Sequence, residues 1–103
     1  MNRSKYLPLT ETTYLVLLAL IEPGHGYVIM QKVEELSDGN VRIAAGTMYG
    51  AIDNLMKLKW IQSVPSSDAR RKVYQITDAG LSILREETNR LRSMLAIADN
   101  LNL

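Results

Sequence analysis

The sequence WIQSVPSSDARRKVYQI, residues 60–76, decides the fold. Its two ends, residues 60–64 and 72–76, are rich in β-branched and aromatic side chains and partly alternate apolar with polar positions, which is typical of short strands. Residues 65–71 between them include a proline, two serines and an aspartate, which favour a turn. We therefore predict a β-hairpin whose connecting loop carries Arg70 and Arg71.

Three helices are predicted before the hairpin, over residues 10–21, 26–36 and 45–58. The first begins at the capping residue Thr10 and ends before the turn-forming sequence Glu22-Pro23-Gly24. It is apolar on nearly all sides, so more than one neighbour must bury it. The second helix carries one apolar stripe, formed by Ile29, Met30, Val33 and Leu36.

The third predicted helix has two unlike faces. Apolar residues recur at helical spacing along one of them: Met48, Ile52, Leu55 and Met56. The opposite face carries Tyr49, Gly50, Asp53, Asn54 and Lys57. We expect the apolar face to join the core and the opposite face to be free to contact a partner.

A fourth, longer helix is predicted from Thr77, which caps it together with Asp78. It carries a heptad seam, formed by Leu81, Leu84, Thr88, Leu91, Leu95 and Ala98, and a second apolar row formed by Ile83, Met94 and Ile97. The seam could pack within its own chain or against a second copy. Because the first helix already fills a small core, we favour a homodimer interface, formed by Leu81, Leu84, Thr88, Leu91, Met94 and Leu95.

Composition excludes several classes of protein. The 103 residues suffice for one core, and with 47% hydrophobic and 22% charged residues the chain is not globally disordered. It has no cysteine and one histidine, so we expect no disulfide, thiol nucleophile or metal site, and no cofactor. The longest apolar run, residues 14–21, is too short to cross a membrane, and the first residues do not resemble a signal peptide. We expect a cytoplasmic protein.

The charge of the chain is unevenly distributed. The net charge is only +1, yet residues 42–72 carry six basic residues against two acidic ones, an excess of +4. This segment is where an anionic partner would bind, although such an excess could also serve only to keep the surface soluble.

Three helices followed by a hairpin with a basic tip form a winged helix-turn-helix, a mainly α fold with a small β-hairpin. In this architecture the third helix enters the major groove of DNA and the wing contacts the adjacent backbone. We predict a DNA-binding domain over residues 1–77 and a C-terminal dimerisation helix over residues 78–103.

Three motifs carry a more specific resemblance: HGY at residues 25–27, IAAGTMY at 43–49 and RRKVYQITDAG at 70–80. In this order the sequence resembles the PadR family of transcriptional regulators, in particular its short type with a single helix after the wing. The resemblance implies a homodimeric repressor, without enzymatic activity, that binds double-stranded DNA at a palindromic operator. Some members respond to small hydrophobic or phenolic molecules that bind between protomers. If this chain binds such an effector, the resemblance implies a site between the first and last helices, around Tyr14, Leu18, Met94 and Leu95.

The same resemblance assigns DNA-binding roles. Thr47 and Tyr49 match the start of the family's recognition helix, and the wing motif matches Arg70, Arg71 and Lys72. Lys57 lies two turns beyond Tyr49 on the same face. The predicted DNA-binding residues are thus Thr47, Tyr49, Gly50, Asp53, Lys57, Arg70, Arg71 and Lys72.

The sequence departs from the family pattern at three points of the third helix. Ala44-Ala45 stands where a serine cap and a proline are usual, so this helix begins without a side-chain cap. Gly50 replaces a larger residue, which weakens the helix but lets the backbone approach DNA. Asp53 could accept a hydrogen bond from a cytosine amine or orient Lys57, and otherwise it repels phosphate.

Other conspicuous residues are given structural roles. His25 is expected to act as a helix cap and Trp60 as a core residue under the wing. Tyr14, Tyr27 and Tyr74 lie among aliphatic residues and are expected in the core or an interface. Because Asp53 and the low net charge do not favour DNA, a winged-helix module for protein contacts is the alternative function. We find no convergent set of acid, base and nucleophile in the sequence, so an enzyme is not expected.

Overall fold

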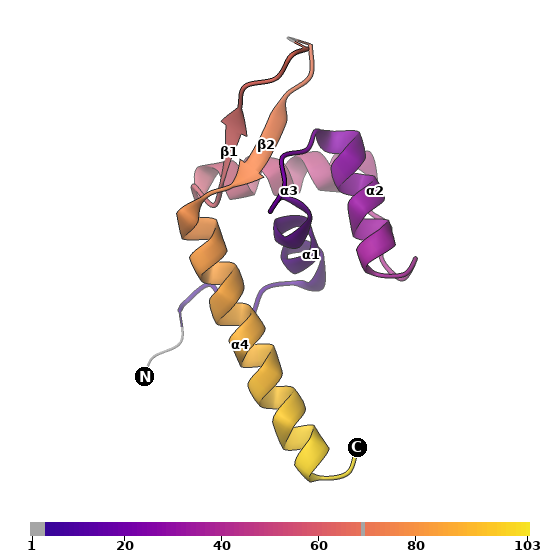
Figure 1. Ribbon diagram of the computed structural model, residues 1–103, viewed down its shortest axis with the longest axis vertical. Helices are drawn as coiled ribbons and strands as arrows, with labels where there is room; N and C mark the ends of the chain where they lie inside the picture. The colour runs from indigo at the N-terminus through magenta and orange to yellow at the C-terminus, as the bar shows by residue number, and fades with distance from the viewer. Residues whose placement is uncertain (1–3, 69) are drawn as a thin grey trace.

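A computed structural model describes residues 4–68 and 70–103. In chain order the elements are α1 (Glu11–Ala19), α2 (Gly26–Leu36), α3 (Ala45–Lys57), β1 (Ile61–Val64), β2 (Val73–Ile76) and α4 (Asp78–Asn100). The two strands pair antiparallel. The predicted mainly α fold with one hairpin is confirmed. In the molecule, which is 52 Å long, the hairpin lies at one end and the C-terminal end of α4 at the other (Figure 1).

Helix α1 is the central core helix, as its sequence predicts. Thr10 caps it by accepting a hydrogen bond from the Thr13 amide at 3.1 Å, and Val16 and Leu17 are completely buried. The helix ends at Ala19, two residues earlier than expected. The reason is tertiary, because the Leu20 carbonyl accepts a hydrogen bond from the Ile76 amide of β2 at 2.8 Å.

The core draws on every helix and both strands. Its fully buried members include Leu20, Ile29, Val33, Met48, Ile52, Leu55 and Ile61. Trp60 is buried beneath the wing as predicted, and its ring meets that of Tyr6 edge to face at 5.1 Å. Leu36 and Met56 were expected in the core but are 54% and 37% exposed. Each lies in the last turn of its helix.

The hairpin is attached to the body at its base and along β2. Beside β2, Gly24 and Tyr74 exchange two backbone hydrogen bonds of 3.0 and 2.9 Å, so the segment before α2 pairs with the wing. At the base, a Cβ placed on Gly80 would lie 2.1 Å from the Trp60 carbonyl oxygen. Only glycine lets the first turn of α4, capped by Thr77, approach the hairpin this closely.

Helix α4 has a buried half and an exposed half. Leu84 is 3% exposed, whereas Leu91, Met94 and Leu95 are 38%, 51% and 62% exposed. Leu81 is half-buried against the core. Leu81 and Leu84, the first part of the seam, therefore pack within their own chain. Only the part of the seam after Thr88 presents exposed apolar side chains to a second copy.

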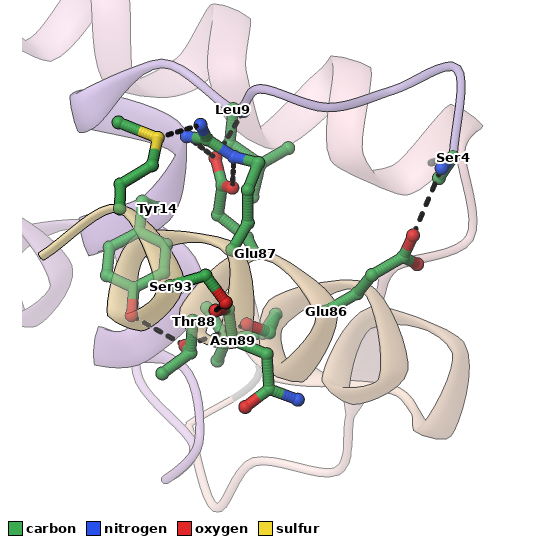
Figure 2. Close-up of polar contacts among 11 residues, drawn as sticks. Ser4, Leu9, Tyr14, Glu86, Glu87, Thr88, Asn89 and Ser93 are labelled. Atoms are coloured by element: carbon green, nitrogen blue, oxygen red, sulfur yellow. Dashed lines mark hydrogen bonds and ion pairs between the residues drawn. The ribbon is translucent and has the colours of Figure 1, made fainter. Parts of the chain in front are cut away.

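A polar layer separates these two halves of α4 (Figure 2). Glu87, which is 1% exposed, accepts a hydrogen bond from the Leu9 amide at 2.7 Å and pairs with the Arg90 guanidinium. The hydrogen bond to Glu87 raises the pKa of Arg90. Beside this pair, the Tyr14 hydroxyl lies 2.6 Å from the Thr88 hydroxyl. A buried carboxylate at this position of α4 was not among the features expected from the sequence.

Candidate nucleic-acid interface

Helix α3 presents a polar face to solvent. Its apolar residues Met48, Ile52 and Leu55 are buried, while the residues predicted to bind DNA are all exposed: Thr47, Tyr49, Gly50, Asp53 and Lys57. Tyr49, Asp53 and Lys57 are spaced by four residues and so share one side of the helix. Ala44 stands at the N-cap without a side-chain hydrogen bond, as its sequence predicts.

Tyr49 and the basic residues of the wing border one surface hollow of about 670 Å³, which we call the wing hollow. Its lining comes from the start of α2, from α3 and from the hairpin: His25, Gly26, Tyr27, Val28, Tyr49, Arg70, Arg71, Lys72 and Tyr74. These three parts of the chain meet at the end of the molecule opposite the C-terminal end of α4 (Figure 1). The other predicted α3 residues, Thr47, Gly50, Asp53 and Lys57, do not line the hollow.

Gly26 sets the distance between α2 and α3. A Cβ at this position would lie 2.8 Å from the Met48 Cε atom and 3.1 Å from the Tyr49 hydroxyl. Tyr49 therefore leans against the first turn of α2, while 55% of its surface stays exposed. A tyrosine placed in this way offers a flat ring to a ligand in a fixed position.

Tyr74 forms the buried floor of the hollow and is 8% exposed. Burial raises the pKa of Tyr74, and the negative charge of Asp53 and the proximity of Tyr49 raise it further. The Tyr74 hydroxyl thus keeps its proton. The negative charge of Asp53 is felt at Tyr74, which lines the same hollow as the basic residues of the wing. Within the described part of the chain Asp53 and Lys57 form no ion pair, so Asp53 does not orient Lys57 here.

The basic wing residues Arg70, Arg71 and Lys72 are exposed. The Asp68 carboxylate accepts a hydrogen bond from the Arg70 amide at 2.9 Å and lies 3.8 Å from the Arg71 Nε atom. Ala69 lies outside the described residues. On the other side of the hollow, the Arg71 Nη1 atom is 3.1 Å from the His25 Nε2 atom.

The structure shows where two residues at the start of α2 lie. His25 occupies the N-cap position, but the prediction that its side chain caps the helix is wrong, because the ring turns toward the wing. Tyr27 is not in the core, since it is 65% exposed in the first turn beside the hollow.

The structure offers no cluster suited to a metal ion: no group of three or more histidine, aspartate or glutamate side chains gathers in residues 4–68 and 70–103. Over the same residues, none of the helices combines the length and apolar character that crossing a membrane requires.

Comparisons with known proteins identify the family and the fold. The model of the transcriptional regulator PadR-like family matches residues 15–86. A PadR-family transcriptional regulator from Eggerthella lenta is 30% identical, with a TM-score of 0.70 over 86% of this chain and 79% of that chain. None of the curated proteins matches this chain.

Two further solved structures share the fold. A PadR-family transcription regulator from Clostridium difficile has a TM-score of 0.77 and 22% identity over 91% of this chain and all of that chain. A PadR-like transcriptional regulator from Bacillus cereus has a TM-score of 0.72 and 24% identity over 95% and 96% of the two chains. Because the family model matches most of its length, the chain belongs to the PadR-like family of transcriptional regulators, which are DNA-binding proteins and not enzymes.

Proposed function

We propose that this regulator is a homodimeric repressor that binds a palindromic operator with α3 of each copy in a major groove and the wings on the flanking backbone. The observation that carries the proposal is the wing hollow, where Tyr49 and three consecutive basic residues meet on one surface. A repressor of this kind acts by occupying promoter DNA, and we place it in the cytoplasm together with that DNA.

The chemistry of this surface suits duplex DNA. Arg70, Arg71 and Lys72 are exposed and can neutralise phosphates, a contribution that does not depend on sequence. Tyr49, half exposed and held against α2, can contact base edges or the thymine methyl group. A Cβ placed on Gly50 would meet no atom of the described residues within 4 Å, so the α3 backbone is open to close approach by DNA.

The second copy is proposed to bind along the exposed half of α4. Leu91, Met94 and Leu95 are exposed there with Ile97 and Leu101, which are 61% and 67% exposed. Apolar side chains repeated along one helix need a covering partner, and a second copy also supplies the two-fold symmetry of a palindromic operator. Leu81, Leu84 and Thr88 then support this interface from within each protomer.

An apolar effector has a suitable place between α1 and α4. A hollow of about 440 Å³ lies there. Its apolar lining is formed by Leu9, Tyr14, Leu15, Val41 and Leu91, and its polar lining by Glu11, Ser37, Asn40, Glu87 and Arg90. Of the residues expected to surround an effector, Tyr14 lines this hollow and Leu18 lines a separate hollow between α1 and α2, while Met94 and Leu95 line neither. We propose that a small hydrophobic or phenolic molecule binds beside Tyr14 and changes the fit between the protomers.

DNA selection tests the central proposal. The purified protein should enrich one palindromic sequence from a pool of random duplexes, and fluorescence anisotropy then gives its affinity at several salt concentrations. Replacing Arg70, Arg71 and Lys72 together by alanine should weaken binding to selected and random duplexes alike. The slope of log K against log salt should become shallower by about 2.7, or about 0.9 for each lost phosphate contact. Arg85→Ala, on α4, is the matched control and should leave the slope unchanged.

Tyr49→Ala should instead reduce the preference at particular bases with little change in the salt slope. A wild-type protein that enriches no sequence would contradict the proposal. If the wing variant then lost a protein partner, the alternative of a protein-interaction module would be favoured.

Light scattering tests the dimer. The wild type should have the mass of two chains, and Leu95→Glu should reduce it to one, because a charge at an apolar interface is left without a partner. Leu36→Glu, which adds the same charge to an exposed leucine of α2, should remain dimeric. A wild-type mass of one chain at micromolar concentration would overturn this part of the proposal.

A further inference from the structure

His25 is the one histidine of the chain, and its side chain contacts the wing and not its own helix. Its Nε2 atom lies 3.1 Å from the Arg71 Nη1 atom, although the two residues are 46 positions apart. Close to this contact, paired backbone hydrogen bonds between Gly24 and Tyr74 join the segment before α2 to strand β2. The backbone that carries His25 is therefore held beside β2 by the fold.

The chemistry of the pair sets the roles of its members. An arginine guanidinium has only donors and stays protonated, so Arg71 donates and His25 accepts. A ring that accepts at Nε2 is neutral and carries its proton on Nδ1. The histidine can thus hold the guanidinium without cancelling its positive charge.

Arg71 has a second partner that acts in the opposite way. Its Nε atom lies 3.8 Å from the Asp68 carboxylate in the loop of the wing. Both side chains are more than half exposed, so this ion pair is weak. A guanidinium drawn fully to Asp68 would point along the wing and lose part of its charge to the carboxylate. Bound to His25, it stays at the wing hollow beside Tyr49.

We propose that His25 is a positioning residue for DNA binding: it holds the Arg71 guanidinium at the wing hollow, with its charge available to a phosphate of the DNA backbone. This inference rests on the proposed DNA-binding function and adds to it a residue outside both α3 and the wing. It predicts that the acceptor atom of residue 25 matters for DNA affinity, whereas its imidazole ring does not.

Two substitutions separate these properties. In His25→Gln, the amide oxygen can occupy the place of Nε2 and accept from Arg71. In His25→Asn, the shorter side chain brings its oxygen only to the place of Nδ1, out of reach of Arg71. Asparagine is a good N-cap residue, so this variant should fold at least as well as the wild type, which thermal unfolding checks.

The experiment measures anisotropy with the duplex selected by the wild-type protein and with a random 30-base-pair duplex. We expect His25→Asn to weaken binding of the selected duplex about tenfold, the loss of one charge-assisted contact. We expect His25→Gln to stay within about twofold of the wild type. In an Arg71→Ala background the His25→Asn change should have no further effect. Adding Asp68→Asn to His25→Asn should recover part of the affinity.

The outcomes distinguish the two proposals. If the wild type selects no duplex, the DNA-binding function itself fails. If the wild type selects a duplex and His25→Asn binds it as tightly as the wild type does, the positioning role is wrong. The role is equally wrong if His25→Asn weakens binding by the same factor with and without Arg71, or if His25→Gln loses as much affinity as His25→Asn.

Discussion

Replacing Glu87 by glutamine tests how the polar layer of α4 holds the fold together. The Glu87 carboxylate is almost completely buried, accepts a hydrogen bond from the Leu9 amide and pairs with Arg90. Glutamine keeps the shape and one acceptor oxygen but removes the negative charge. Its NH2 group then faces either the Leu9 amide or the guanidinium, and both of these are donors.

The expected loss in the free energy of unfolding is about 2 kcal/mol. Hydrogen bonds to charged groups contribute about 1.5–3 kcal/mol and those between neutral groups about 1, and a buried donor left without an acceptor adds to the loss. Water at the partly exposed Arg90 reduces the effect, which is why we take the lower part of this range. For a chain of about 100 residues, 2 kcal/mol corresponds to a decrease in Tm of about 8–16 °C.

The neighbouring residue supplies a matched control. Glu86 also accepts a hydrogen bond from the N-terminal segment, from the Ser4 amide at 3.0 Å, but it is exposed. Glu86→Gln should therefore change stability by less than about 0.5 kcal/mol. Urea unfolding followed by circular dichroism, at one fixed chain concentration because dimers are stabilised by mass action, measures both variants. Equal midpoints for Glu86→Gln and Glu87→Gln would refute the reasoning.

Three further predictions concern single side chains. Gly80→Ala should destabilise the protein by about 3 kcal/mol or more, because its Cβ meets the Trp60 carbonyl at 2.1 Å, and urea unfolding measures this. Gly50→Ala, in open space within α3, should instead stabilise it by about 0.5–1 kcal/mol yet weaken DNA binding in anisotropy, since the new methyl group faces the DNA. Burial and Asp53 raise the pKa of Tyr74 above 10.0, so above about pH 10 the unfolded state loses this proton first and stability falls. Tyr74→Phe should show a smaller loss of stability between about pH 9 and about pH 11, and a loss equal to that of the wild type would contradict this.

The fold follows from the sequence because its main signals are local. Thr10 and Thr77 cap their helices as predicted, and the β-prone segments form the two strands. The end of α1 could not be predicted, because a hydrogen bond between Leu20 and β2 decides it. The burial of Glu87, in contrast, is indicated by its position in the sequence. It stands four residues after Ile83 and seven before Met94, within the apolar row of α4. A charge at such a position indicates a buried ion pair once its partner, Arg90, is found in the next turn.

The candidate site was only partly predictable for a similar reason. Helical spacing predicts the exposed face of α3, and the turn composition predicts a basic wing. Neither shows that the start of α2 lies against that wing, since the pairing of Gly24 with Tyr74 creates this contact between distant segments. Sequence spacing therefore could not identify His25 as a neighbour of Arg71.

The polar layer also determines how the two ends of the molecule are related. A purely apolar seam could slide along α1 by one turn at little cost, because leucines replace one another in similar surroundings. The contacts of Glu87 with Leu9 and of Thr88 with Tyr14 exist in one register only, and any shift leaves a buried carboxylate without its partners. The direction in which the exposed half of α4 leaves the body is thus fixed. In the proposed dimer that direction sets the separation of the two α3 helices, which must match half-sites about 34 Å apart on DNA.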